Sequence, residues 1–393
     1  MKVLAVHNHY RHAGGEDAVF RAEVELLRQN RHEVIEYTNH NDALSDLSRV
    51  QAAARTIWSR KSVQDLSQLI RRHTPDIAHF HNVFPLISPS AYHACRRLGV
   101  PVVQTLHNFR LLCPSATLFR DGHVCHDCVG RAVPWPGIVH GCYRGSRAQS
   151  AVVAGMLVLH RGIGTWRNQI DVYIALSQYA MDTFVRAGFP AAKFVIKPNF
   201  VSPDPGRGDG SGGYALFVGR LTPEKGVRTL LLAWERLGHI PLKIVGDGPL
   251  LRETVARVQE RRLKVEVLGV RPHAQVIGLM TGAYCLVFPS EWYEGFPMAI
   301  LEAYACGVPV VASRLGTMAE VVHDNRTGLL FAAAKPEDLA SQVEELWRRP
   351  DLRRQLGGLA REEFESRYTD RSNHEALMRI YHQARECKAA WKA

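Results

Sequence analysis

The sequence predicts an α/β protein with two doubly wound parallel-sheet domains. Short apolar runs alternate with amphipathic helical stretches in both halves, and many runs end in glycine or histidine. Between the halves, the stretch SPDPGRGDGSGG breaks every periodicity, which is typical of a linker. At 393 residues, the chain is long enough for two such domains. The predicted N-terminal domain comprises residues 1–201 and includes an insertion at 112–145, and the linker comprises 202–213. The predicted C-terminal domain comprises 214–374, and a last helix, 375–393, packs back on the N-terminal domain.

The composition is that of an ordinary globular protein with an excess of positive charge. Hydrophobic residues make up 46% and charged residues 22%, and the net charge is +11. That excess indicates an anionic partner, and nucleic acid, a phosphorylated substrate and an anionic membrane are all compatible with it. No stretch approaches the roughly 20 apolar residues that span a bilayer, and the chain opens with the strand-like run KVLAV. We therefore expect a cytoplasmic protein.

In the N-terminal half, two features point to a ligand at the edge of the sheet. Gly14 and Gly15 lie between the first strand and the first helix, where a phosphate loop would lie, but GxGxxG and a P-loop lysine are both missing. The glycines therefore predict close approach of a ligand to the backbone rather than a dinucleotide site. His107 follows the strand 100–106, and His81 ends the strand before it. Because parallel strands end at the same edge, we expect His107 to lie beside the glycine loop.

The insertion 112–145 contains four clustered cysteines: Cys113, Cys125, Cys128 and Cys142. A CxxC pair flanked by two more cysteines in a reducing compartment favours structural zinc over disulfides, while free thiols and a ligand set of three cysteines and one histidine stay open. Four thiolate ligands leave no open coordination position, so this metal would not be catalytic. The apolar stretch 150–160 that follows, with arginines around it, is either a buried helix or an interfacial segment held by anionic lipid.

In the C-terminal half, the first loop carries two cations. Strand 214–218 leads into GRLTPEKG, so that Arg220 and Lys225 flank a turn from strand to helix. A diphosphate there would meet a guanidinium, an ammonium and a helix N-terminus. Gly246 follows the next strand, 242–245, and indicates a crevice close to the backbone.

The stretch 289–313 reads as a loop, a helix and a strand that follow a buried strand. Pro297 can start a helix, and the loop before it brings the N–H groups of Gly295 and Phe296 to a helix N-terminus. Glu294 and Glu302 frame this loop. The neighbours of Glu302 in the helix are apolar, so its carboxylate has little exposed face and needs a partner.

These motifs resemble a known family. GRLTPEKG, GDGP, the pair Glu294-x7-Glu302 around EGFP, ACGVPVVAS and TGLL are similar to the retaining GT-B glycosyltransferases of group 1, also called glycosyltransferase family 4. The similarity is strong over 214–331 and weaker, though collinear, in the N-terminal half. It departs from the family at Asn108, where Asp is common after the histidine, and in the cysteine insertion.

The resemblance implies two Rossmann-like domains facing a cleft and a nucleotide-diphosphate sugar as donor. Arg220 and Lys225 would hold the diphosphate, Glu302 the ribose hydroxyls, and Glu294 with the loop 295–297 the transferred sugar. His107 and Gly15 would approach from the other domain. Front-face attack, with the leaving phosphate taking the acceptor's proton, requires neither a protein base nor a catalytic metal. Neither glutamate is then expected to act as a glycosidase-type acid or nucleophile.

The expected function is retaining transfer of a hexose-type sugar to a saccharide or lipid-linked acceptor, in cell-envelope or exopolysaccharide biosynthesis. Peripheral attachment to the inner face of the cell membrane is compatible with it. A nucleotide-sugar epimerase of the same fold is the alternative. A nucleic-acid binder that uses the four-cysteine module is disfavoured, because aromatic residues do not interleave with the basic ones there.

Overall fold

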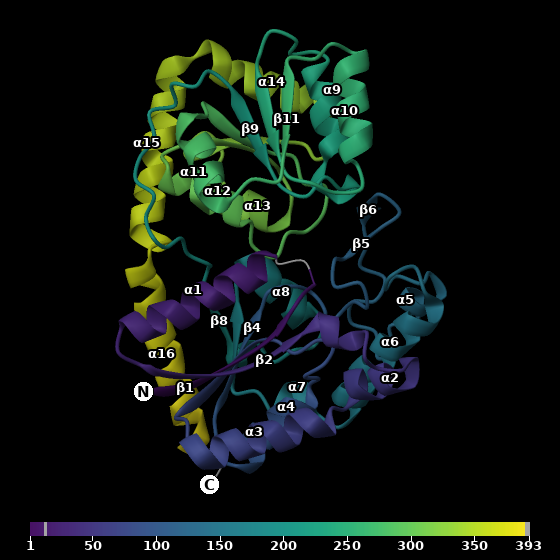
Figure 1. The fold of residues 1–393 in the computed structure, drawn as a ribbon. Helices are drawn as coiled ribbons and strands as arrows, with labels where there is room; N and C mark the ends of the chain where they lie inside the picture. Colours follow the sequence, from purple (N-terminus) through teal and green to yellow (C-terminus); the bar gives the residue numbers. More distant parts are fainter. Residues whose placement is uncertain (12–13, 390–393) are drawn as a thin grey trace. The chain divides into compact units, whose positions relative to one another are not determined.

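The computed structural model describes residues 1–11 and 14–389, and it divides into two compact units (Figure 1). The first unit comprises Met1–Leu118, His126–Pro198 and Asn373–Ala393, and the second comprises Phe119–Cys125 and Asn199–Ser372. Part of the loop before Gly14 and the end of the last predicted helix, 390–393, lie outside the described residues. Among the described residues, none of the helices has both the length and the apolar character needed to cross a bilayer.

The first unit is built on a six-stranded sheet with the order β2-β1-β3-β4-β7-β8. All its pairings are parallel, with Leu4 opposite both Ile35 and Ala78. The order reverses between β1 and β3, which is where doubly wound sheets open a crevice for ligands. The strands are β1 (Lys2–His9), β2 (Glu33–His40), β3 (Ile77–Asn82), β4 (Val102–Leu106), β7 (Val172–Ala175) and β8 (Phe194–Ile196).

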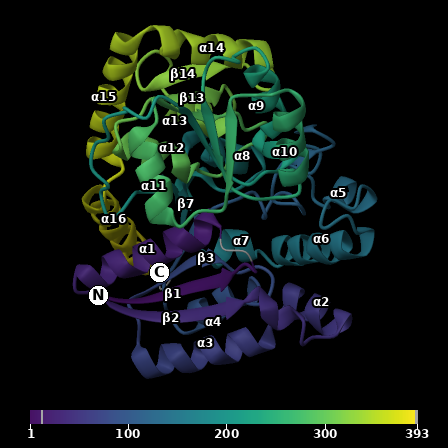
Figure 2. The same cartoon turned by 45° about the horizontal axis from the view of Figure 1, so that its top comes forward.

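Helices cover both faces of this sheet. Figure 2 shows α1 above β1 and β2, with α3 and α4 below them. The last helix joins the core on the α1 side, where its Leu377 and Tyr381 pack with Val3 and Leu27. The helices are α1 (Gly15–Gln29), α2 (Arg49–Ile57), α3 (Arg60–His73), α4 (Ser90–Arg97), α5 (Trp135–Val139), α6 (Arg147–Gly162), α7 (Thr165–Asn168), α8 (Gln178–Arg186) and α16 (Asp370–Ala389).

The second unit has its own six-stranded parallel sheet with the order β11-β10-β9-β12-β13-β14. This is the strand order of a dinucleotide-binding fold, and it reverses between β9 and β12. The loops that follow these two strands are the two that the sequence motifs single out. The strands are β9 (Ala215–Val218), β10 (Leu242–Val245), β11 (Val265–Gly269), β12 (Cys285–Phe288), β13 (Val310–Ser313) and β14 (Gly328–Phe331).

Two hydrophobic clusters fill the second unit, one on each face of its sheet. One includes Ile300 of α12 and Phe364 of α15, and the other Leu230 of α9 and Val343 of α14. The sheet is therefore buried on both sides, which explains why its strands read as continuous apolar runs. The helices are α9 (Val227–Trp234), α10 (Leu251–Glu260), α11 (His273–Gly282), α12 (Met298–Ala305), α13 (Gly316–Val321), α14 (Pro336–Arg348) and α15 (Pro350–Arg367).

Two irregular stretches have more structure than their composition indicates. The cysteine insertion contains a short antiparallel hairpin, β5 (Phe119–Arg120) and β6 (His123–Val124), as well as α5. The stretch expected to be a linker is held along the second unit, because the N–H groups of Gly208, Gly210 and Gly212 each donate to a backbone carbonyl there. Glycine-rich extended backbone has no periodicity, but its hydrogen-bonding groups still need partners.

Candidate active site

The loops after β9 and β12 form one body in the second unit. The loop after β9 turns through a short 3-10 helix, Pro223–Lys225, and enters α9 at Gly226, whose φ is +70°. A Cβ on Gly226 would lie 1.8 Å from the carbonyl oxygen of Pro289, so only glycine permits this approach. The N–H of Glu291 also donates to the carbonyl of Glu224 at 2.8 Å. The point where the strand order reverses is therefore closed by two loops in direct contact.

Lys225 and Glu294, predicted separately from the two motifs, meet across these loops. The Nζ atom of Lys225 lies 2.6 Å from Oε1 of Glu294, and their side chains are 16% and 8% exposed. The hydroxyl of Ser290 donates to the same carboxylate oxygen. The ammonium also lies 5.4 Å from the centre of the Trp292 ring. Glu294 is thus held in one position by the Lys225 ammonium and the Ser290 hydroxyl. The sequence motifs did not pair it with either group.

Arg220, the other predicted cation, is differently placed. Its side chain is 68% exposed, and its guanidinium is 3.9 Å from Glu224. Such a distance in solvent contributes little attraction. Arg220 therefore keeps its charge and hydrogen-bond donors available to an anion from solution.

Glu302 has the partner that its apolar surroundings require. Its side chain is 15% exposed and accepts a hydrogen bond of 3.0 Å from Nε2 of His273, the first residue of α11. This hydrogen bond raises the pKa of His273 above its ordinary value, against the effect of burial. His273 was not singled out from the sequence. Its position just after β11, where the neighbouring strands end in glycine loops, is the signal that could have found it.

The loop after β10 lies directly against the loop after β9, at the glycine where the sequence predicts a crevice close to the backbone. Gly246 has a φ of +140°, and a Cβ there would lie 1.9 Å from the carbonyl oxygen of Gly219. The N–H of Gly219 donates to Val245, and that of Leu221 to Asp247. Two loops therefore run against each other with bare backbone between them.

The segment from Glu294 to α12 differs in one detail from its prediction. The helix begins at Met298, and Pro297 is the residue that caps it rather than its first residue. Gly295 and Phe296 are half-buried, and the Phe296 ring packs against the core of the unit. The predicted arrangement of a loop leading into a helix N-terminus is otherwise present.

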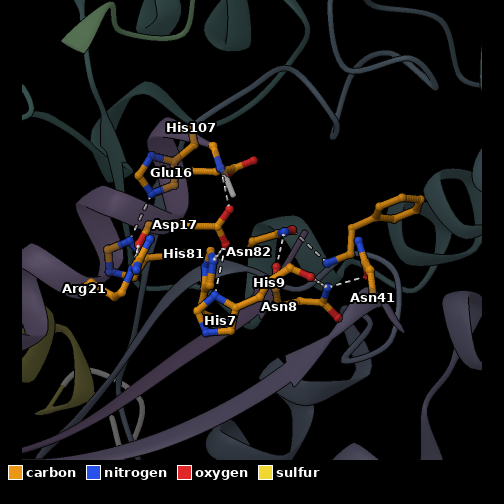
Figure 3. A network of polar contacts seen from close by, with 12 residues as sticks. His7, Asn8, His9, Glu16, Asp17, Arg21, Asn41, His81, Asn82 and His107 are labelled. Atoms are coloured by element: carbon orange, nitrogen blue, oxygen red, sulfur yellow. Dashed lines mark hydrogen bonds and ion pairs between the residues drawn. The ribbon is translucent and has the colours of Figure 1, made fainter. Parts of the chain in front are cut away.

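In the first unit, the glycine loop leads into α1 at a hydrogen-bonded carboxylate. Gly14 caps the helix and Gly15 begins it, and the N–H of Gly14 donates to Oδ2 of Asp17 at 2.9 Å. The other oxygen, Oδ1, accepts from Nε2 of His7 at 2.8 Å and from Nδ1 of His9 at 3.0 Å (Figure 3). Burial raises the pKa of Asp17, but these hydrogen bonds outweigh it and hold the pKa at about 2.

His107 lies at the same edge, beside His81. Its Nε2 is 3.0 Å from Nδ1 of His81, and the two rings stack with centres 5.2 Å apart. Burial lowers the pKa of both histidines well below the ordinary value, and the neighbouring histidines add to this effect. His81 and His107 are therefore both uncharged near neutral pH.

A carboxylate lies nearby. Asn108 donates to the carboxylate of Glu16 at 3.3 Å, and burial raises the pKa of Glu16 to about 7.

The described residues contain two groups of potential metal ligands whose ligand atoms lie within 4.8 Å of one another. The cysteines belong to neither group, so the structure lends the zinc prediction no support, and it stays a prediction for elemental analysis of the purified protein. In the group that contains Glu23, the ammonium of Lys197 lies 2.5 Å from this carboxylate and already supplies a cation. The groups are His7, His9 and Asp17, and Glu23, His79 and His81.

Two family models match the chain in succession. The model described as glycosyltransferase family 4 matches residues 13–205, and the one described as glycosyl transferases group 1 matches residues 207–363. An uncharacterized glycosyltransferase of Methanocaldococcus jannaschii is 36% identical over 150 residues, which are 38% of this chain and 42% of that protein. The O-antigen chain mannosyltransferase B of Escherichia coli is 36% identical over 135 residues, or 32% of this chain and 34% of that protein. The alignments thus span less than half of these relatives.

Solved structures share the fold over nearly the whole chain. The Anabaena protein HepE in complex with UDP has 18% identity and a TM-score of 0.68, and the match covers 97% of this chain and 99% of that one. Sucrose-phosphate synthase from Thermosynechococcus elongatus has 17% identity and a TM-score of 0.72, with 97% and 98% covered. The chain therefore has the two-domain GT-B fold of these structures, and a region that matches glycosyltransferase family 4 is followed by one that matches the group 1 glycosyl transferases.

Proposed function

We propose that the protein transfers a hexose-type sugar from a nucleotide-diphosphate sugar to a saccharide or lipid-linked acceptor, with retention of configuration. The observation that carries the proposal is the pair of loops at the strand reversal of the second unit, where Lys225 meets Glu294 and Arg220 stays exposed. Ligands of doubly wound sheets bind at this reversal. Relatives named as an O-antigen mannosyltransferase and a glycogen synthase, and a structural neighbour that holds UDP-glucose, support the same class of donor and acceptor.

The cations would act on the leaving group. Departure of a nucleoside diphosphate leaves negative charge on its phosphate oxygens, and a fixed cation stabilises that charge most when it needs no rearrangement. Lys225 is already fixed by Glu294, whereas Arg220 supplies two forked N–H donors from the solvent side. Removing one such donor costs about 3 kcal/mol of transition-state stabilisation.

The two glutamates would bind hydroxyls rather than attack the sugar. Oε1 of Glu294 already accepts from Lys225 and Ser290, and Glu302 accepts from His273. Each carboxylate keeps further acceptor sites for sugar or ribose hydroxyls. Carboxylates engaged in this way are poor nucleophiles, which agrees with front-face attack and no protein base.

A thermal-shift panel of nucleotide sugars identifies the donor, and product analysis then tests the reaction. The expected result is stabilisation by one nucleotide sugar, followed by transfer to an acceptor whose new glycosidic bond keeps the donor's anomeric configuration by NMR. Inversion of the anomeric centre would contradict retention. Release of an epimerised sugar without any acceptor would instead favour the epimerase.

A surface on the first unit favours attachment to anionic membrane, and hence a lipid-linked acceptor. We define the α5–α6 patch as the exposed apolar side chains of α5 and α6, of the chain just before α5 and of the residue just after α6, with the arginines around them. Trp135 is 51% exposed and Val139 48% exposed. The guanidinium of Arg131 lies 5.4 Å from the centre of the Trp135 ring, and Arg147 donates to the carbonyl of Val139. The patch consists of Arg131, Val133, Trp135, Val139, Arg147, Leu159, Arg161 and Ile163.

Apolar side chains framed by arginines match the boundary between acyl chains and anionic headgroups. Helix α6 buries Val153, Met156 and Leu157, which agrees with the buried-helix alternative for this stretch, while attachment to lipid is the proposal made here. Flotation with vesicles that contain about a third phosphatidylglycerol is the test. The wild type should float and Trp135→Ser with Val139→Ser should not, while Val270→Ser, at a 70% exposed valine of the second unit, should float like the wild type. Equal flotation of all three proteins would exclude the patch.

A further inference from the structure

A line of buried polar side chains in the first unit leads from Lys197 to His107. Lys197, just after β8, is 1% exposed, and its Nζ lies 2.5 Å from Oε1 of Glu23 in α1. The other oxygen, Oε2, lies 3.3 Å from Nε2 of His81, at the end of β3. Nδ1 of His81 in turn lies 3.0 Å from Nε2 of His107, after β4 (Figure 3). Four residues from four elements are thus joined in a single line.

The charge state of Glu23 follows from its partner. Both side chains of the Lys197–Glu23 pair are buried, and an ammonium in contact with a carboxylate stabilises its ionised form. Among the described residues Oε2 of Glu23 accepts no hydrogen bond, and of the two histidine nitrogens near it Nε2 of His81 is the closer, at 3.3 Å against 3.9 Å for Nδ1 of His79. Glu23 therefore presents a buried, negatively charged acceptor that lacks a good donor.

This acceptor decides which nitrogen of His81 carries the proton. If Nε2 of His81 held a lone pair, that lone pair would lie 3.3 Å from an ionised oxygen and be repelled by its charge. With the proton on Nε2, the positive end of the N–H group lies beside that oxygen instead, which favours this tautomer through charge alone, without a well-aligned hydrogen bond. A neutral imidazole has one proton, so Nδ1 of His81 then holds the lone pair.

The same reasoning passes to His107. Its Nε2 faces the lone pair of His81 Nδ1 at 3.0 Å and must donate the proton of that hydrogen bond. Its Nδ1 is then a hydrogen-bond acceptor, and no contact to it is seen among the described residues. We propose that Lys197, Glu23 and His81 are positioning residues that hold His107 in the tautomer with the proton on Nε2, so that its Nδ1 accepts a hydrogen bond from a sugar hydroxyl.

The proposal names the chemistry that His107 would recognise, and it rests on the proposed function for the identity of the ligand. A neutral acceptor nitrogen binds an O–H group and repels a phosphate oxygen, so His107 would contact sugar rather than diphosphate. Besides Glu23 and His81, the charged and titratable groups that act on His107 are His7, His79, Lys197 and Asp17. Of these six groups, only His81 is hydrogen-bonded to His107.

The test removes the ion pair without leaving a buried charge. In the double variant Glu23→Leu with Lys197→Met, apolar side chains of similar size replace the pair, a change that proteins tolerate with little loss of stability. His160→Gln is the matched control. It removes another buried histidine of the first unit, which hydrogen-bonds Thr165 and the carbonyl of Ile57 and takes no part in the line.

The primary measurement is the pair of ¹⁵N chemical shifts of the His107 ring, assigned by comparison with His107→Gln. In the wild type, Nε2 should be protonated and Nδ1 not, and in the double variant this preference should be lost. With the donor found by thermal shift, kcat of the double variant should fall about tenfold while its Kd for the nucleoside diphosphate stays unchanged, and His160→Gln should keep both values. A proton on Nδ1 of wild-type His107 would overturn the proposal, as would a double variant that keeps the tautomer or keeps kcat. The tautomer is measured without turnover, so a protein with no transferase activity would refute the proposed function but not the tautomer.

Discussion

Replacing Lys225 by methionine separates its structural role from its proposed catalytic role. At 2.6 Å and an effective dielectric constant of about 20, the attraction between Lys225 and Glu294 is about 6 kcal/mol, and desolvation of the two charges offsets much of it. Removing one partner of such a pair leaves the other charge uncompensated, which costs about 3–5 kcal/mol when fully buried. Because both side chains keep some exposure, we expect Lys225→Met to lower the free energy of unfolding by about 3 kcal/mol.

The double variant Lys225→Met with Glu294→Gln separates the loss of stability from the loss of activity. It contains no unpaired charge, so its unfolding free energy in urea should return to within about 1 kcal/mol of the wild type. Its kcat/KM for the donor should stay about 100-fold low or lower, because the cation proposed to face the leaving diphosphate and the carboxylate proposed to bind the sugar are both missing. Lys243→Met is the control, since this partly exposed lysine of β10 pairs with Glu266 at 3.6 Å and should change stability by less than about 1 kcal/mol and leave activity unchanged.

Two results would refute this reasoning. If the double variant regained activity together with stability, neither charge would be needed for transfer, and the proposed assignments of Lys225 to the diphosphate and of Glu294 to the sugar would both be wrong. If Lys225→Met were as stable as the wild type, the pair would be energetically unimportant despite its burial.

Three further predictions concern other parts of the two units. Arg220→Ala should lower kcat/KM about 100-fold with a Tm within about 2 °C of the wild type, because its side chain is 68% exposed; a normal kcat/KM would remove Arg220 from the site. Gly246→Ala should lower the free energy of unfolding in urea by at least about 3 kcal/mol, because its Cβ would lie 1.9 Å from the carbonyl oxygen of Gly219. An unchanged free energy of unfolding would contradict the close approach. Burial holds the pKa of His79 at about 4, below the ordinary 6.5, so that as the pH falls His79 is protonated in the unfolded chain before it is protonated in the folded one. The free energy of unfolding of the wild type should therefore fall by about 3 kcal/mol relative to that of His79→Asn between pH 6.5 and pH 4, measured by urea unfolding. A difference between the two proteins that does not change with pH would contradict this prediction.

The sequence alone determined the features that depend on near neighbours in the chain. Runs of apolar residues predicted the parallel strands of both sheets, because strands covered on both faces need apolar side chains at every position. Glycine at the ends of strands indicated where backbone comes close, as at Gly246. Apolar neighbours along one helix were enough to show that Glu302 needs a partner.

The tertiary structure decided which of these features meet. The identity of the partner of Glu302, the contact between Lys225 and Glu294, and the line from Lys197 to His107 each join residues that are 26 or more positions apart in the chain. They depend on the order of the strands and on how helices pack on the sheets, which follow from burying distant apolar surfaces together. Short-range patterns carry no record of that choice, so side chains that complete a site from another loop are visible only once the chain is folded.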